Sequence, residues 1–236
     1  MNRPFPESQV DQRYYEVATP NSLVERIVIR ARDQIFRDFM RVAKPNVTDT
    51  LLDVGISDVL GPAANVIERC YPQQAQITAV GLGAADMFQA EFPQVRYRQI
   101  EANCPLPFAD HSFDLATSNA VLEHVGSLDN QRFFVSELCR VARRVFITVP
   151  HRYFPVEHHT KIPFLHWSDS SFGLACSALG KSKWARPDNL ILMSRARLAA
   201  SCPPGASAQT GFTGILLGRC SSNLYCYLPG AAGRTS

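Results

Sequence analysis

Hydrophobic residues follow two different periods along the chain. Between Asn21 and Val42 they recur at about every 3.6 positions, which predicts an amphipathic helix that begins with Ser22 and Glu25 as a capping box. Farther on, short apolar runs typical of buried strands alternate with helical segments. The predicted strands cover residues 50–54, 76–81, 95–100, 113–117 and 144–149, and the predicted helices cover 61–70, 85–92 and 128–142, the last capped by Asp129 or Asn130.

This alternation predicts a parallel sheet with helices on both faces. After Pro150 it stops, and a mixture of histidine, proline and large apolar side chains precedes a predicted helix over 188–202 and two predicted strands, 206–212 and 223–228. Right-handed crossovers place the loops after parallel strands along one edge of the sheet, where open α/β sheets bind ligands. The loops expected at that edge are residues 55–61, 81–86, 101–107, 118–124 and 150–160.

The composition is that of an ordinary soluble globular protein. Of 236 residues, 46% are hydrophobic and 19% are charged, and the net charge of +3 gives no reason to expect nucleic acid or an anionic membrane as partner. Seven cysteines with no C-x-x-C spacing favour reduced thiols and a cytoplasmic protein over a disulfide framework. The first residues, MNRPFPESQVDQ, lack the apolar region of a secretory signal, and no apolar run approaches the ~18 residues of a membrane span.

The loop after the first predicted strand resembles a nucleotide-binding turn with too few glycines. The dinucleotide pattern G-x-G-x-x-G, started at Gly55, meets Ser57 and Leu60 where it requires glycine. The Walker pattern G-x-x-x-x-G-K-[ST] is also absent from the sequence. A tight turn with Asp53 at the strand end therefore indicates a ligand smaller than a dinucleotide.

Three segments in order point to one family. The string DVGIS begins at Asp53, PLPFADHSFDLATSNAVLEHV follows the third predicted strand, and RRVFITVP ends at Pro150. Together they resemble a class I S-adenosylmethionine-dependent methyltransferase that acts on small molecules, of the methyltransferase type 11 kind. The resemblance implies an α/β fold, a Rossmann-like three-layer sandwich with a seven-stranded, mostly parallel sheet and an antiparallel last strand, and S-adenosyl-L-methionine as cofactor.

The same resemblance assigns cofactor contacts to the edge loops. It places the methionine part of the cofactor on the first loop and the ribose beyond the second strand, where Gly81 stands in place of the family's acidic residue. Asp86 or the backbone near Gly81 then holds the ribose. The adenine is expected near the third loop and the reactive sulfonium above the fourth. The implied cofactor residues are Asp53, Gly55, Ser57, Gly81, Glu101, Asn103 and Asn119.

The segment HRYFPVEHHTKIPFLHW, residues 151–167, holds four of the six histidines. No metal is expected there, because the adjacent His158 and His159 would point to opposite faces of a strand and no H-E-x-x-H pattern occurs. Its position beside the cofactor loops favours a role in holding the methyl acceptor, while hydrogen bonds that fasten a long loop are the competing interpretation. The candidate catalytic residues are His124, His151 and His158, and the candidate acceptor contacts are Arg152, Tyr153, Glu157 and His159.

We therefore expect a single methyltransferase domain over residues 1–236, with an N-terminal helical segment (1–49), a cofactor-binding core (50–150), a substrate-side loop or lid (151–190) and a final helix and strand pair (191–236). The expected function is methyl transfer to an unidentified small-molecule, glycan or lipid-type acceptor. Two alternatives stay open: an inactive interaction module of the same fold, favoured by Gly81, and a nucleotide-dependent enzyme, disfavoured by Ser57 and Leu60.

Overall fold

The computed structural model describes residues 22–218 and 220–230; the expectation for the first twelve residues lies outside this part. Seven strands form one sheet in the order β3-β2-β1-β4-β5-β7-β6. The strands that pair in parallel are β1 (Leu51–Val54), β2 (Ile77–Gly81), β3 (Arg96–Gln99), β4 (Phe113–Asn119) and β5 (Ala142–Pro150). β7 (Cys220–Leu228) runs antiparallel both to β5 and to β6 (Gln209–Leu217). The predicted fold class is confirmed.

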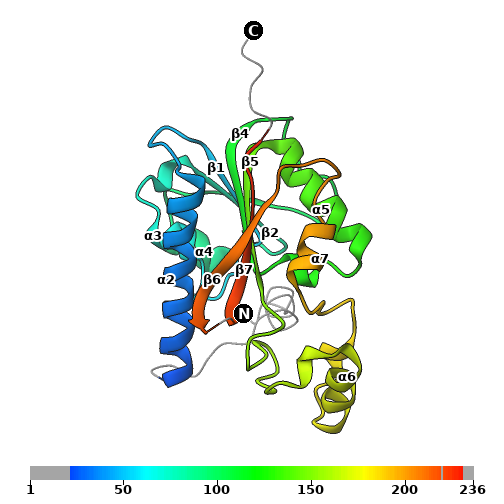
Figure 1. Cartoon of the computed structure of the whole chain (residues 1–236). Helices are drawn as coiled ribbons and strands as arrows, with labels where there is room; N and C mark the ends of the chain where they lie inside the picture. The colour runs from blue at the N-terminus through cyan, green and yellow to red at the C-terminus, as the bar shows by residue number, and fades with distance from the viewer. Residues whose placement is uncertain (1–21, 219, 231–236) are drawn as a thin grey trace.

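Helices cover both faces of this sheet (Figure 1). On one face lie α2 (Leu23–Ala43), α3 (Val66–Cys70) and α4 (Asp86–Glu91), and on the other lie α5 (Leu128–Val141) and α7 (Arg195–Ala200). Each face has its own apolar core, because the strands are buried on both sides. Phe39 and Phe88 belong to the first core, and Leu138 and Leu198 belong to the second.

A third, smaller core lies beyond the carboxyl ends of the parallel strands. It surrounds α6 (Asp169–Ala178), which Figure 1 shows at the end of the sheet opposite the start of β5. Its buried side chains include Phe172, Cys176 and Trp184. The short 3-10 helices are η1 (Gln74–Gln76), η2 (Leu122–His124), η3 (Leu165–Trp167) and η4 (Ser182–Ala185). Among the described residues, every helix is too short or too polar to cross a bilayer.

Two predicted helices are only partly helical. Within 188–202 the helix begins at Arg195, because Leu190, Leu192 and Met193 are buried as an extended segment between other elements. Within 61–70 the helix begins at Val66, since Asn65 has a φ of +45°. The Asn65 side chain accepts the N–H of Ser57 and donates to its carbonyl. In both places contacts between distant segments override the local helical pattern.

The caps of the two long helices give one confirmation and one correction. Ser22 caps α2 as predicted, with its Oγ 3.1 Å from the backbone nitrogen of Glu25. The prediction that Asp129 or Asn130 caps α5 is wrong, because Ser127 accepts the backbone N–H of Asn130 at 3.1 Å. Asp129 lies in the first turn, where its charge favours the helix dipole.

Ser127→Ala should therefore lower the free energy of unfolding by about 1 kcal/mol, the usual cost of removing a serine cap. Urea denaturation monitored by circular dichroism measures the change. Ser136→Ala, on the exposed side of the same helix, is the matched control, because its hydroxyl only bonds the carbonyl of Phe133. Equal stability of the two variants would contradict the assignment of the cap.

Candidate cofactor and acceptor site

Gly55 lies at the edge of the sheet where β1 ends. Its φ of +102° belongs to the region that favours glycine, and its N–H donates to the carbonyl of Val80 at 2.9 Å. A Cβ added to Gly55 would lie 2.1 Å from Cγ2 of Val121. The turn after β1 and the loop after β4 thus approach each other so closely at this edge that only glycine fits between them.

The rest of the first loop is held by two side chains that the sequence did not single out. Asn65 accepts the N–H of Ser57 at 3.1 Å and donates to its carbonyl at 2.8 Å. Asp58 accepts the N–H of Phe88, in the first turn of α4, at 2.8 Å. The bond from Phe88 to Asp58 joins the loop after β1 to the start of α4, and those of Asn65 join the two ends of the loop after β1.

Asp53 faces inward and forms a buried pair with Glu68 of α3. The side chain of Asp53 accepts the hydroxyl of Thr117 at 3.0 Å. Neither carboxyl oxygen of Glu68 meets the distance and angle of a hydrogen bond with any of the described residues. Burial raises the pKa of Asp53 to about 6, and burial together with the Asp53 charge raises the pKa of Glu68 well above its ordinary value. Two neighbouring buried carboxyls favour binding of a proton or a cationic group. Glu68 was not among the expected site residues, and only its helical segment in the sequence pointed to its position.

Gly81 is closely packed at the end of β2. A Cβ on Gly81 would lie 3.2 Å from the hydroxyl of Tyr97 and 3.3 Å from the side chain of Ile56. The Tyr97 hydroxyl donates to the carbonyl of Gly83, which fixes the ring against this position. Asp86, the alternative for the ribose, is exposed at the start of α4.

Glu101 and Asn103 follow β3 in an exposed turn. Asn103 has a φ of +56°, and the carboxylate of Glu101 accepts the thiol of Cys104 at 3.7 Å. Both side chains are open to solvent at the same edge of the sheet as Gly81. The structure therefore brings them near the second loop without assigning either a ligand.

Asn119 ends β4 and links three elements. Its Oδ1 accepts Arg32 Nη1 of α2 at 2.6 Å and the hydroxyl of Thr148 of β5 at 2.5 Å. Arg32 lies inside a predicted amphipathic helix, so no local signal distinguished it from a solvated charge. The two donors fix the orientation of the Asn119 side chain at the centre of the edge.

His124 and Glu123 lie in η2, in the loop that follows Asn119. His124 Nδ1 is 2.6 Å from the carbonyl of Asn189, to which it must donate, and burial lowers the pKa of this imidazole to about 3. Glu123 is fully buried, and neither of its carboxyl oxygens has a hydrogen-bond partner in the part of the chain that the structure describes. Burial raises its pKa to about 7. Glu123 was not predicted, although it precedes His124 in the motif LEHV.

Glu157 organises the turn that contains His158 and His159. Its carboxylate accepts His159 Nδ1 at 2.8 Å, the backbone N–H groups of His159 and Thr160, and the hydroxyl of Thr160 at 2.7 Å. These bonds, most of all those from His159, hold the pKa of Glu157 well below its usual range despite burial. His158 and His159 therefore lie in a turn and not on the strand assumed for them, and burial lowers the pKa of His158 to about 3.

His151 lies in a different environment from the other two candidate catalytic histidines. Its Nδ1 is 3.2 Å from the carbonyl of Ser221 on β7, and its ring is 5.5 Å from that of Tyr153. Burial lowers its pKa. Arg152 donates to the carbonyls of His166 and Trp167 and, at 2.9 Å, to the carboxylate of Asp169. These bonds join it to η3 and to the start of α6. Of this group only Tyr153 is largely exposed.

The central part of the chain matches one family model. Residues 52–145 match the family model described as a methyltransferase domain. No curated protein matches the chain. The match covers strands β1 to β4 and the start of β5, which carry the loops described above.

Solved structures share the fold at low sequence identity. A SAM-dependent methyltransferase from Aquifex aeolicus is 14% identical, with a TM-score of 0.52 over 95% of this chain and 98% of its own. The N-methyltransferase NodS from Bradyrhizobium japonicum WM9, in complex with S-adenosyl-L-homocysteine, is 9% identical with a TM-score of 0.53, covering 89% and 88% of the two chains. Magnesium protoporphyrin IX methyltransferase from Synechocystis PCC 6803 is 13% identical with a TM-score of 0.52, covering 93% and 91%. Residues 52–145 thus match a model of a methyltransferase domain, and the chain shares the fold of these S-adenosylmethionine-dependent methyltransferases.

Proposed function

We propose that the protein transfers a methyl group from S-adenosyl-L-methionine to a small-molecule acceptor, free or as part of a glycan or lipid. The observation that carries this proposal is the turn at Gly55, inside a methyltransferase domain, where the loops after β1 and β4 meet with no room for a side chain. Such a turn lets a ligand lie against backbone at the edge where open α/β sheets bind ligands.

The residues at this edge fit the charges of the cofactor. The buried Asp53–Glu68 pair is a suitable neighbour for the ammonium of the methionine part, since the unpartnered carboxyl of Glu68 gains from a nearby cation. Ser57 lies in the loop fixed by Asn65 and contributes polar groups next to Gly55. Asn119, held by Arg32 and Thr148, lies in the fourth loop, below the expected place of the sulfonium.

The ribose and adenine are assigned to the second and third loops. A side chain at position 81 would meet Tyr97 and Ile56, so the backbone from Gly81 to Gly83 is the more suitable partner for the ribose hydroxyls. Glu101 and Asn103 follow at the end of β3 and are the partners proposed for the adenine amine. We assign the donor to residues 50–150 and the acceptor to residues 151–190.

When bound, the cofactor supplies an electrophilic methyl group that a nucleophile displaces in line, leaving S-adenosylhomocysteine. The chain contributes mainly by holding the acceptor collinear with the breaking bond, since positioning accounts for much of the rate of such reactions. His124 and His158, with pKa values near 3, are weak bases that stay neutral and orient the loops. His151, beside the exposed ring of Tyr153, is the better candidate to accept the acceptor's proton, with Arg152, Glu157 and His159 shaping the segment around it.

Calorimetry with S-adenosylhomocysteine tests the proposal. We expect one binding site, with no comparable binding of a nicotinamide dinucleotide, because Ser57 and Leu60 replace the glycines that a pyrophosphate needs. Transfer of labelled methyl from S-adenosylmethionine to extract fractions then separates an enzyme from an inactive module. Binding without transfer to any fraction would favour the module, and binding of the dinucleotide alone would favour the nucleotide-dependent alternative. The seven free cysteines support the proposed cytoplasmic location.

A further inference from the structure

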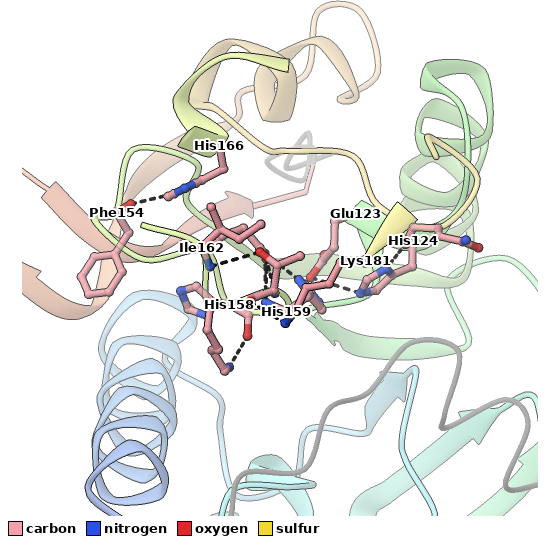
Figure 2. A network of polar contacts seen from close by, with 12 residues as sticks. Glu123, His124, Phe154, His158, His159, Ile162, His166 and Lys181 are labelled. Atoms are coloured by element: carbon pink, nitrogen blue, oxygen red, sulfur yellow. Dashed lines mark hydrogen bonds and ion pairs between the residues drawn. The ribbon is translucent and has the colours of Figure 1, made fainter. Parts of the chain in front are cut away.

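Three potential metal ligands converge next to the proposed acceptor side. Glu123 and His124 come from η2 after β4, and His159 comes from the turn after β5 (Figure 2). One ligand atom from each of the three lies within 4.8 Å of the other two. The rings of His124 and His159 are 4.9 Å apart and nearly perpendicular, and Glu123 Oε1 is 3.9 Å from His124 Nε2. The group therefore joins two segments that are far apart in the sequence.

Glu123 supplies an independent sign that a cation is required. It is 0% exposed, and neither carboxyl oxygen has a hydrogen-bond partner among the described residues. A buried carboxylate is stable only when it is paired, coordinated or protonated. Arg32 is a nearby cation and Glu157 a nearby anion, and neither is hydrogen bonded to Glu123. A bound cation would satisfy this carboxylate.

The two imidazoles are already oriented as metal ligands are. His124 Nδ1 donates to the carbonyl of Asn189 at 2.6 Å, and His159 Nδ1 donates to Glu157 at 2.8 Å. Metal-binding histidines usually donate one ring N–H to a carbonyl or carboxylate, which sets the tautomer and directs the other nitrogen at the metal. Trp184 packs on the His159 ring at 4.7 Å and limits its rotation. In both residues Nε2 is the nitrogen that does not take part in that hydrogen bond, and Nε2 of His124 lies 3.9 Å from Glu123 Oε1.

We propose that Glu123, His124 and His159 bind a divalent transition-metal ion, with zinc as the best match to two imidazoles and one carboxylate. Zinc bonds of about 2.0–2.1 Å require ligand atoms about 3.3 Å apart, so the group contracts by about an ångström on binding. Three protein ligands leave a fourth position open. An acceptor oxygen would be a suitable fourth ligand.

His159 meets a different histidine from the one expected from the sequence. The prediction that no metal binds here assumed that His158 and His159 lie side by side on a strand. In the structure His159 lies in a turn, and its ring contacts that of His124 from another loop. The Nε2 of His158 instead borders a cavity of about 10 Å³ that Glu123 and His166 also line. A cavity of that size holds about one water, which is the competing way to satisfy Glu123.

Titration of the metal-stripped full chain with zinc, followed by calorimetry, tests the proposal. We expect one equivalent to bind, and His159→Ala and Glu123→Gln each to weaken the affinity by about 100-fold or more, beyond the range for an outer partner. His111→Asn removes an exposed histidine and should bind zinc as the unaltered protein does. S-adenosylhomocysteine binding by each variant reports independently on whether the donor site is intact.

Cobalt(II) absorption and histidine nitrogen-15 spectra of the unaltered protein keep the test decisive if a variant fails to fold. Zinc should shift the Nε2 resonances of His124 and His159 and leave that of His111 in place. The cobalt spectrum should lack an intense thiolate band, because all three ligands are oxygen or nitrogen. Absence of binding, a thiolate band from the cysteines, or equal affinity in Glu123→Gln would overturn the proposal and leave a buried water at Glu123.

Discussion

Gly55→Ala should weaken the binding of S-adenosylhomocysteine by about 100-fold or more. The new Cβ would lie 2.1 Å from Cγ2 of Val121 and 3.3 Å from its Cβ, so the whole Val121 side chain must move. That movement displaces the fourth loop from the first, and both loops are assigned to the donor. The φ of +102° adds backbone strain of about 1–3 kcal/mol for any residue other than glycine. Calorimetry gives the affinity and thermal denaturation gives the stability.

Two further variants separate binding from folding. Gly61→Ala is the matched control, because a Cβ at Gly61 meets no atom within 4 Å and should change the affinity little. Adding Val121→Ala to Gly55→Ala removes the collision and leaves the strain, so it should restore part of the affinity. Unchanged affinity in a folded Gly55→Ala protein would show that the donor lies elsewhere.

Stability should fall as the pH rises through the pKa of Asp53, and Glu68→Gln should reduce that fall. The pKa of Asp53 is raised from 3.8 to about 6 by burial, so the folded state retains a proton that the unfolded state has already released. This contribution is fully present below pH ~4 and lost above pH ~6, and a difference of two pKa units corresponds to about 3 kcal/mol. The raised pKa of Glu68 extends the same trend to higher pH.

Urea denaturation at pH 5 and pH 8 measures this effect. The difference in unfolding free energy between the two pH values should be smaller in Glu68→Gln than in the unaltered protein, since a buried carboxyl with a raised pKa is gone. Glu101→Gln, a change of an exposed carboxyl, controls for general charge effects. Parallel pH profiles of all three proteins would contradict the raised pKa of Glu68.

The strands of the sheet can be predicted from the sequence because each is marked by its own short apolar run. Apolar runs such as residues 144–149 remain strands in almost any context when both faces are buried, and β5 is found at Ala142–Pro150. The helix predicted over 188–202 was wrong in its first half, because Ile191 donates to the carbonyl of Glu123 and the carbonyl of Met193 accepts the N–H of Arg152. Such bonds between distant segments leave no periodic trace in the sequence.

In the candidate site, too, local features could be predicted from the sequence and contacts between distant segments could not. Gly55 was predicted as a turn glycine, and the structure adds that Val121 leaves no room for a side chain there. Glu68, Arg32 and Glu123 were missed, since a charged residue in a helix or a short turn has the same local pattern whether it is solvated or buried. The three histidines proposed as catalytic lie in different surroundings, and the contacts of Ser221 with His151 and of Asn189 with His124 depend on segments about 65 to 70 residues away.

The separate core around α6 has a consequence for how such a protein diversifies. Phe172, Cys176 and Trp184 pack among themselves and share no buried side chain with the two cores on the sheet. The unit contacts the sheet edge through hydrogen bonds such as those of Arg152 with Asp169 and of His124 with Asn189, and through the ring of Trp184, which packs against that of His124. Substitutions inside this unit can therefore accumulate while the two cores on the sheet keep their packing. The acceptor that the protein recognises can then change while the proposed donor site stays the same.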